Sequence, residues 1–118
     1  MSYFRFVPSI DPAYLSTFCK GDRARMERYI RQYLDSSPAA FAQLAEKLSA
    51  DDAEGLAFVA HSLRPQATFM GAQAILELLS SIEQRARAEG AAACTELVKS
   101  LAPLCEQVHT ELRTLLSA

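Results

Sequence analysis

Apolar residues recur every three or four positions along almost the whole chain, and this spacing is the strongest constraint on its fold. It gives a helix one apolar face, whereas a half-buried strand needs alternating apolar and polar residues, which no segment here sustains. Glycine, which weakens helix interiors, occurs only four times in 118 residues. The sequence therefore predicts an all-α fold.

Capping signals divide the first half of this pattern into helices. Asp11 and Pro12 are an N-cap residue followed by a proline at the first helical position, and they predict a short helix that ends near Gly21. Asp22 is the expected N-cap of a longer second helix. The Ser-Ser-Pro segment at 36–38 either kinks that helix or ends it, and the spacing is compatible with both.

The second half contains three more helical segments. Asp51, with Glu54 three residues later, resembles a capping box for the next helix, and Gly90 is a typical C-cap for the one after it. Residues 94–116 form the last amphipathic stretch, with a bend expected at Pro103. Together these signals predict an up-and-down four-helix bundle with a short additional N-terminal helix.

Composition narrows the class of protein. A chain of 118 residues, half of them hydrophobic and 22% charged, suits one domain spanning 1–118, with 1–9 as a short N-terminal arm. Cys19, Cys94 and Cys105 have no metal-ligand spacing and predict a reducing, cytoplasmic location. The net charge of −2 argues against nucleic acid as a partner. No apolar run approaches the ~20 residues of a membrane span.

Few residues could support catalysis. The chain has two histidines and no Gly-rich phosphate-binding loop, and its histidines and scattered cysteines make a poor zinc set, so no metal site is expected. The carboxylate pair Asp51 and Asp52 is explained by the preference of a helix N-terminus for negative charge. Most classes of enzyme are therefore not indicated.

His61 stands apart because of the direction in which it points. At about 100° per residue, it projects roughly 140° from the centre of the apolar stripe on its helix, so we expect it to face solvent. The stripe comprises Leu56, Val59, Ala60, Leu63, Ala67 and Met70. On the side of His61 we expect Ala57, Arg64, Pro65 and Thr68. An exposed histidine on a helix is usually incidental, so direction alone does not assign a function.

The sequence around His61 resembles the signature of histidine-containing phosphotransfer (HPt) domains. Residues 60–67 read Ala-His-Ser-Leu-Arg-Pro-Gln-Ala, and the family pattern is Ala-His-x-Leu-Lys/Arg-Gly with a hydrophobic-Gly pair ten residues after the histidine, where Gly71 falls. Ile82-Glu83 resembles a Leu-Glu pair of the family. The resemblance extends from about Asp11 to Leu115.

This resemblance implies roles for individual residues. His61 would be phosphorylated, Arg64 would neutralise the phosphoryl group, and Glu83 would hydrogen-bond the ring, although a solvent-facing carboxylate is an equally good interpretation of Glu83. The family's glycine after the basic residue is replaced here by Pro65, which lacks an amide donor and could weaken transfer or alter the fit of a partner.

The resemblance also implies partners. Response-regulator receiver domains, a hybrid sensor histidine kinase or both would dock around His61, over Ala57, Phe58, Pro65 and Thr68. Packing within the bundle is as good an interpretation of Phe58. The chain would be a monomeric phosphoryl carrier rather than a stand-alone enzyme. It would bind no cofactor, because Mg²⁺ belongs to the receiver.

Two other interpretations remain open. The chain could be an HPt-like docking module that is never phosphorylated and that regulates a receiver or kinase, which the proline at position 65 favours. It could also be a generic helical adaptor that completes a bundle with another chain. The second predicts a concentration-dependent dimer and no effect of His61→Ala.

Overall fold

The computed structural model describes residues 8–117, which form five α-helices and one 3₁₀-helix and contain no strand. The helices are α1 (Ala13–Phe18), α2 (Arg23–Ser49), α3 (Ala53–Phe69), α4 (Gln73–Glu89), η1 (Ala91–Cys94) and α5 (Thr95–Ser117). The all-α prediction is confirmed. Most of the N-terminal arm expected at 1–9 lies outside the described residues.

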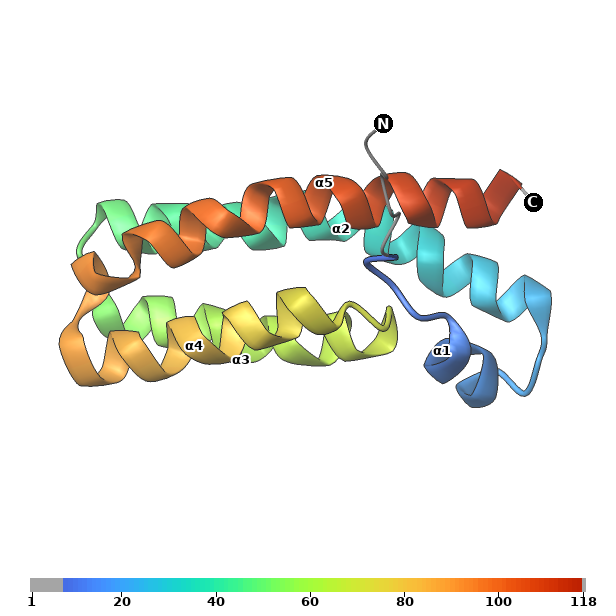
Figure 1. Ribbon diagram of the computed structural model, residues 1–118, viewed down its shortest axis with the longest axis horizontal. Helices are drawn as coiled ribbons and strands as arrows, with labels where there is room; N and C mark the ends of the chain where they lie inside the picture. Colours follow the sequence, from blue (N-terminus) through green and yellow to red (C-terminus); the bar gives the residue numbers. More distant parts are fainter. Residues whose placement is uncertain (1–7, 118) are drawn as a thin grey trace, which may run out of the picture.

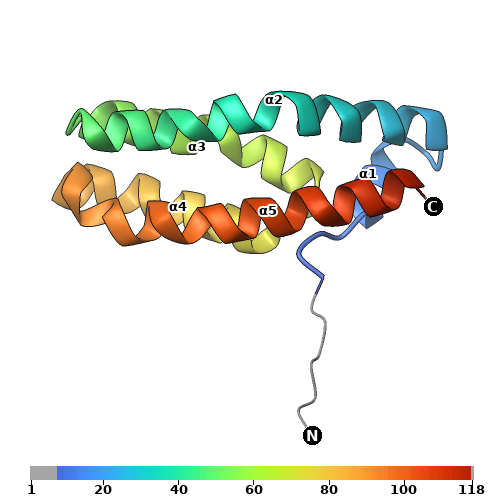
Figure 2. The ribbon, with the colours of Figure 1, turned by 90° about the horizontal axis from the view of Figure 1, so that it is seen from above.

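Helices α2 to α5 form the bundle, and each runs antiparallel to the next along the chain (Figure 1). The two longest helices, α2 and α5, lie side by side and extend beyond α3 and α4 at one end (Figures 1 and 2). Helix α1 packs at this end, against α2 and α3. The predicted up-and-down four-helix bundle with a short additional helix is therefore confirmed.

Side-chain caps define where α2 and α3 begin. Asp22 caps α2 as predicted, because its carboxylate accepts a hydrogen bond from the amide of Arg25 at 3.2 Å. The cap predicted at Asp51 is wrong by one residue. Asp51 has a φ of 53° and ends α2, and Asp52 caps α3 by accepting from the amide of Gly55 at 2.9 Å. The reversal between the helices is thus one residue longer than the pattern suggested.

Three helices contain an internal proline and none ends there. Helix α2 runs through Pro38, so the Ser-Ser-Pro segment does not break it, and α5 runs through Pro103. Both rings are exposed to solvent, where water can bond the carbonyl four residues earlier. Pro65 likewise lies inside α3, and the histidine helix is continuous around it.

Buried side chains from all five α-helices form a single hydrophobic cluster. The six apolar residues predicted for the stripe of α3 are all buried within it. Gly71 fixes the end of α3 against the chain before α1: its φ is 65°, its carbonyl accepts from the amide of Asp11 at 3.0 Å, and a Cβ there would collide with the Asp11 backbone. The histidine helix is thereby tied to the N-terminal segment.

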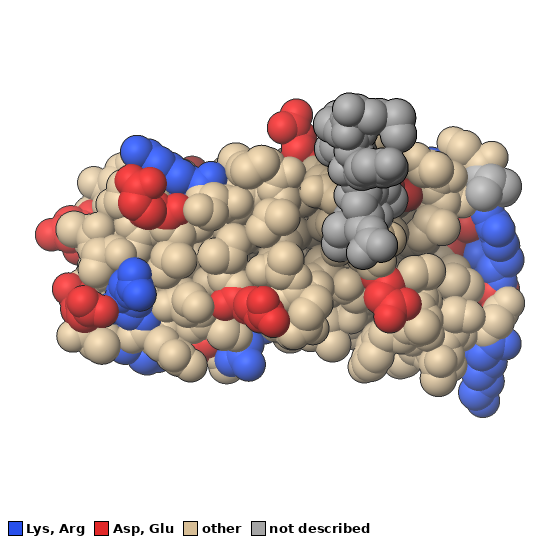
Figure 3. All heavy atoms as spheres, in the orientation of Figure 1, with Lys and Arg blue, Asp and Glu red and all other residues tan. Residues whose placement is uncertain are grey.

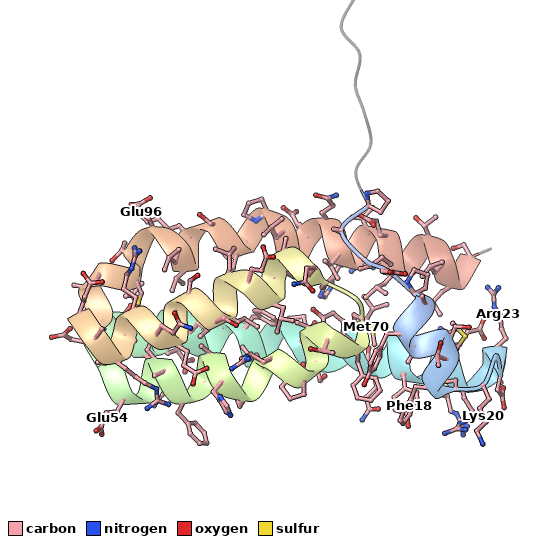
Figure 4. All side chains as sticks on the ribbon, turned by 60° about the horizontal axis from the view of Figure 1, so that its bottom comes forward. Phe18, Lys20, Arg23, Glu54, Met70 and Glu96 are labelled. Atoms are coloured by element: carbon pink, nitrogen blue, oxygen red, sulfur yellow. The ribbon has the colours of Figure 1, made fainter. Side chains whose placement is uncertain are left out.

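Charged side chains of both signs are interspersed on the face that α4 and α5 present in Figure 3. Such mixing is typical of a solvated surface. In Figure 4, Glu54 and Glu96 mark one end of the molecule, and Phe18, Lys20, Arg23 and Met70 gather toward the other. The α1 end therefore combines aromatic and basic side chains.

Candidate functional site

His61 lies in the middle of α3 and points away from the core. Its side chain is 63% exposed, as the apolar stripe predicted. Its helix packs against α2, α4 and α1. The imidazole is therefore fixed at its base and open to another molecule at its tip.

Glu83 of α4 binds one nitrogen of this ring. Its two carboxylate oxygens lie 3.1 and 3.2 Å from Nδ1 of His61. An ionised carboxylate can only accept hydrogen bonds, so Nδ1 is the donor. In the neutral ring the lone pair then resides on Nε2, which makes Nε2 the nucleophilic atom. The carboxylate thus selects which nitrogen can react.

Two arginines neutralise the same carboxylate. Nη1 of Arg64 lies 3.3 Å from one oxygen of Glu83, and Nη2 of Arg87 lies 3.6 Å from the other. Burial opposes ionisation of Glu83, but the hydrogen bonds and charges of His61 and Arg64 outweigh it and lower the pKa of the carboxyl group. The carboxylate is therefore ionised at neutral pH.

A shallow hollow of about 400 Å³ opens beside the imidazole. Its lining comprises Tyr14, His61, Arg64, Pro65, Thr68, Phe69 and Leu76. Three elements contribute to it, because Tyr14 comes from α1 and Leu76 from α4. An incoming group could therefore contact the ring, a guanidinium and an apolar wall at once.

The four residues expected around His61 do not all share its face. Phe58 is 70% exposed, and Pro65 and Thr68 are also exposed. Ala57 is fully buried, so its predicted place on the docking surface is wrong. Helix α3 packs against both α2 and α4, and its buried face is consequently wider than the stripe used for the prediction.

Phe69, near the end of α3, belongs to an aromatic cluster. Its ring contacts those of Phe18, Tyr14 and Tyr29 at centroid distances of 5.0, 5.6 and 5.9 Å. Edge-to-face and offset-stacked pairs of this kind stabilise a fold beyond the area they bury. The cluster holds α1 against α3 beside the hollow.

Sequence reasoning missed Arg87 and the contribution of α1. Arg87 follows Glu83 by four residues, and this spacing brings two side chains together on a helix, so the pair could have been found. No spacing rule connects Tyr14 with His61, because their proximity depends on how α1 packs. Within residues 8–117, no three histidine, cysteine or acidic side chains gather in a way that could hold a metal ion.

The second histidine has a different setting. His109 of α5 is half-buried, and its Nε2 lies 2.8 Å from the hydroxyl of Ser37 on α2. Burial lowers the pKa of His109, and the charge of Arg113 adds to this effect. His109 and Ser37 line a hollow of about 530 Å³ between α2 and α5. This site is separate from the hollow beside His61.

Comparison with known families identifies the protein family. The model of the Hpt domain family matches residues 28–118. The chain belongs to the Hpt domain family. Membership implies phosphotransfer within a two-component phosphorelay, and the resemblance noted in the sequence is confirmed.

A solved structure supports the fold of this Hpt domain. The HPt domain of a sensor hybrid histidine kinase from Shewanella superposes with a TM-score of 0.78 and is 16% identical, with 92% of this chain and 94% of that one covered. At this identity the likeness concerns the fold alone. Comparison with curated proteins gave no match. No helix among residues 8–117 is long and apolar enough to cross a membrane.

Proposed function

We propose that His61 accepts a phosphoryl group from a phospho-aspartate receiver domain and passes it to another receiver. The observation that carries this proposal is an exposed imidazole whose Nδ1 is held by an ionised carboxylate. In this arrangement the free lone pair is on Nε2, and the side chain that carries it is mostly exposed to solvent. A nucleophile for phosphoryl transfer needs both properties.

The bonds formed and broken in this transfer balance, and no further reagent is needed. The Nε2 lone pair forms the N–P bond, the P–O bond of the acyl phosphate breaks, and its electron pair stays on the receiver's aspartate. The proton on Nδ1 remains in place, so the ring acquires a positive charge that faces Glu83. Such transfers depend on positioning and charge neutralisation more than on covalent catalysis. Arg64 is the nearest cation on the histidine helix and would neutralise the phosphoryl oxygens.

The docking surface would surround the hollow beside His61. Phe58, Pro65 and Thr68 are exposed on α3, and Tyr14, 51% exposed, extends the surface onto α1. Phe58, which is 70% exposed, would add apolar area to this surface. The receiver would bring its own aspartate and Mg²⁺, and this chain would need no cofactor.

In this proposal the domain acts as a monomer in the cytoplasm and exchanges phosphate with response regulators, a hybrid sensor kinase or both. The three cysteines are all free, which fits a reducing compartment.

Pro65 supports one alternative, in which the domain binds a receiver without being phosphorylated. The proline stands where the family pattern has glycine, and it lines the hollow that a receiver would approach. Its ring adds bulk and removes an amide at that point. Binding without transfer is the outcome that this alternative predicts.

One experiment separates the two functions. A phosphorylated receiver domain with Mg²⁺ is mixed with the wild-type chain or with His61→Gln, and label is followed onto this chain. Acid-labile, base-stable label on the wild type alone is expected. Measurable binding with no label from any of several receivers would reject the relay and favour the docking module.

A further inference from the structure

Arg87 is a cation of the site that neither the motif nor the docking surface includes. It lies on α4 one turn after Glu83 and approaches the carboxylate oxygen that Arg64 does not contact. Arg64 comes from α3, one turn after His61. The carboxylate of Glu83 therefore has one cation on the phosphate-accepting helix and another on its own helix.

Phosphorylation of His61 would place a second anion near Arg64 and Arg87. A phosphoryl group brings close to two negative charges near neutral pH. Arg64 is three residues from His61 on the same helix, close enough to pair with that group. If Arg64 turns to the phosphoryl oxygens, Glu83 loses a cation just as a dianion arrives nearby. The repulsion between the two anions then rises.

Arg87 is placed to counter this repulsion. Its contact with Glu83 lies within one helix at a spacing of four residues, so it does not depend on the position of Arg64. The side chain of Glu83 is only 16% exposed, which limits the screening that water can supply. A second cation on the carboxylate would keep it ionised and bonded to Nδ1 while the ring is positively charged.

We propose that Arg87 is a positioning residue that holds Glu83 on Nδ1 of His61 after Arg64 has moved to the phosphoryl group. The inference rests on the proposed function and assigns a cation to each state of the site. In the resting state both arginines pair with Glu83. In the phosphorylated state Arg87 alone retains Glu83, and the phosphohistidine persists longer as a result.

The test compares Arg87→Gln with Arg85→Gln. Both variants remove one positive charge from an exposed position on α4, but Arg85 pairs with Glu89 at 3.6 Å. The wild type and both variants are equilibrated with a phosphorylated receiver, and the fraction of label on this chain and the half-life of the phosphohistidine are measured. Arg87→Gln should lower both by about threefold, the size expected for one exposed ion pair. Arg85→Gln should match the wild type.

Two further variants separate positioning from general effects. Arg87→Lys should restore most of the label, because it keeps the charge. In a Glu83→Gln background, Arg87→Gln should have no additional effect, since its action passes through the carboxylate. Equal losses for Arg87→Gln and Arg85→Gln would overturn the proposal, as would an undiminished effect of Arg87→Gln in the Glu83→Gln background.

The outcomes also distinguish this inference from the proposed function. If the wild type takes no label from any receiver, the phosphotransfer proposal fails and the inference fails with it. If the wild type is labelled and Arg87→Gln behaves like the wild type, only the role of Arg87 is rejected. Thermal unfolding of each variant, followed by circular dichroism, checks that lost label does not reflect lost structure.

Discussion

The two histidines of this domain occupy comparable places and have opposite properties. Each lies within a long helix and bonds one side chain of a neighbouring helix: His61 bonds Glu83, and His109 bonds Ser37. His61 is mostly exposed and its partner is charged, whereas His109 is half-buried and its partner is a neutral hydroxyl.

This difference explains why the imidazole of His61 suits phosphoryl transfer and that of His109 suits packing within the bundle. A carboxylate partner can balance the positive ring that phosphorylation at Nε2 creates, and exposure admits the donor. At His109 it is Nε2 that bonds the buried hydroxyl, and burial favours the uncharged ring. The role of each histidine therefore follows from the charge of its hydrogen-bond partner and from which ring nitrogen remains free to react.

The largest expected effect is on phosphate transfer itself. His61→Gln should abolish labelling by a phosphorylated receiver, because it removes the nucleophile. His109→Gln should leave the initial rate of labelling within about twofold of wild type, since conservative changes away from the reacting groups have small effects. Quantified autoradiography of both variants measures this. Equal losses in the two would remove the distinction between the histidines.

Glu83→Gln should have the next largest effect. The amide keeps a hydrogen-bond acceptor but not the negative charge that faces the ring, so transfer to His61 should slow by about tenfold, the value of a charge-assisted hydrogen bond. Glu77→Gln, an exposed change on the same helix, is the matched control. Rapid-quench measurements of labelling give both rates. An unchanged rate in Glu83→Gln would mean that the charge of the partner is unimportant.

A smaller effect is expected on stability at the second histidine. Ser37→Ala should lower the free energy of unfolding by about 1 kcal/mol, because it removes the buried partner of His109. Ser36→Ala is the control, since that neighbouring hydroxyl is exposed. Urea unfolding measures the difference. Phosphate transfer should be unaltered in both, and a lower rate in Ser37→Ala alone would show that the two sites are coupled.

The smallest effect concerns pH. Because the pKa of His109 is lowered in the folded chain, the unfolded chain binds more protons as the pH falls below the ordinary value of 6.5. The contribution of His109 to stability is therefore complete above that pH and declines below it. Urea midpoints of wild type and His109→Gln at pH 7.5 and 5.5 should show the steeper decline in wild type. Parallel declines would assign the pH dependence to other groups.

The sequence was sufficient where the information is local. The spacing of apolar residues predicted the helices and the exposure of His61. The contact between Glu83 and His61, 22 residues apart, was implied only by the family resemblance, and a solvent-facing carboxylate was an equally good interpretation. The predictions from the sequence failed where the position of a residue depends on tertiary packing. Ala57 is buried because α3 packs on two helices, and the cap moved to Asp52 because the preceding helix ends with a left-handed residue. The place of Tyr14 in the hollow has no local signal at all.

The aromatic cluster bears on where this domain can be cut from its chain. The family match begins at residue 28, and a fragment beginning there would lack α1. Tyr14 and Phe18 would be missing, and two of the three rings that contact Phe69 would be replaced by water. Such a fragment would keep the phosphate-accepting histidine but expose a new apolar patch, which favours aggregation. We therefore expect a stable fragment to begin before α1, upstream of the boundary that family comparison suggests.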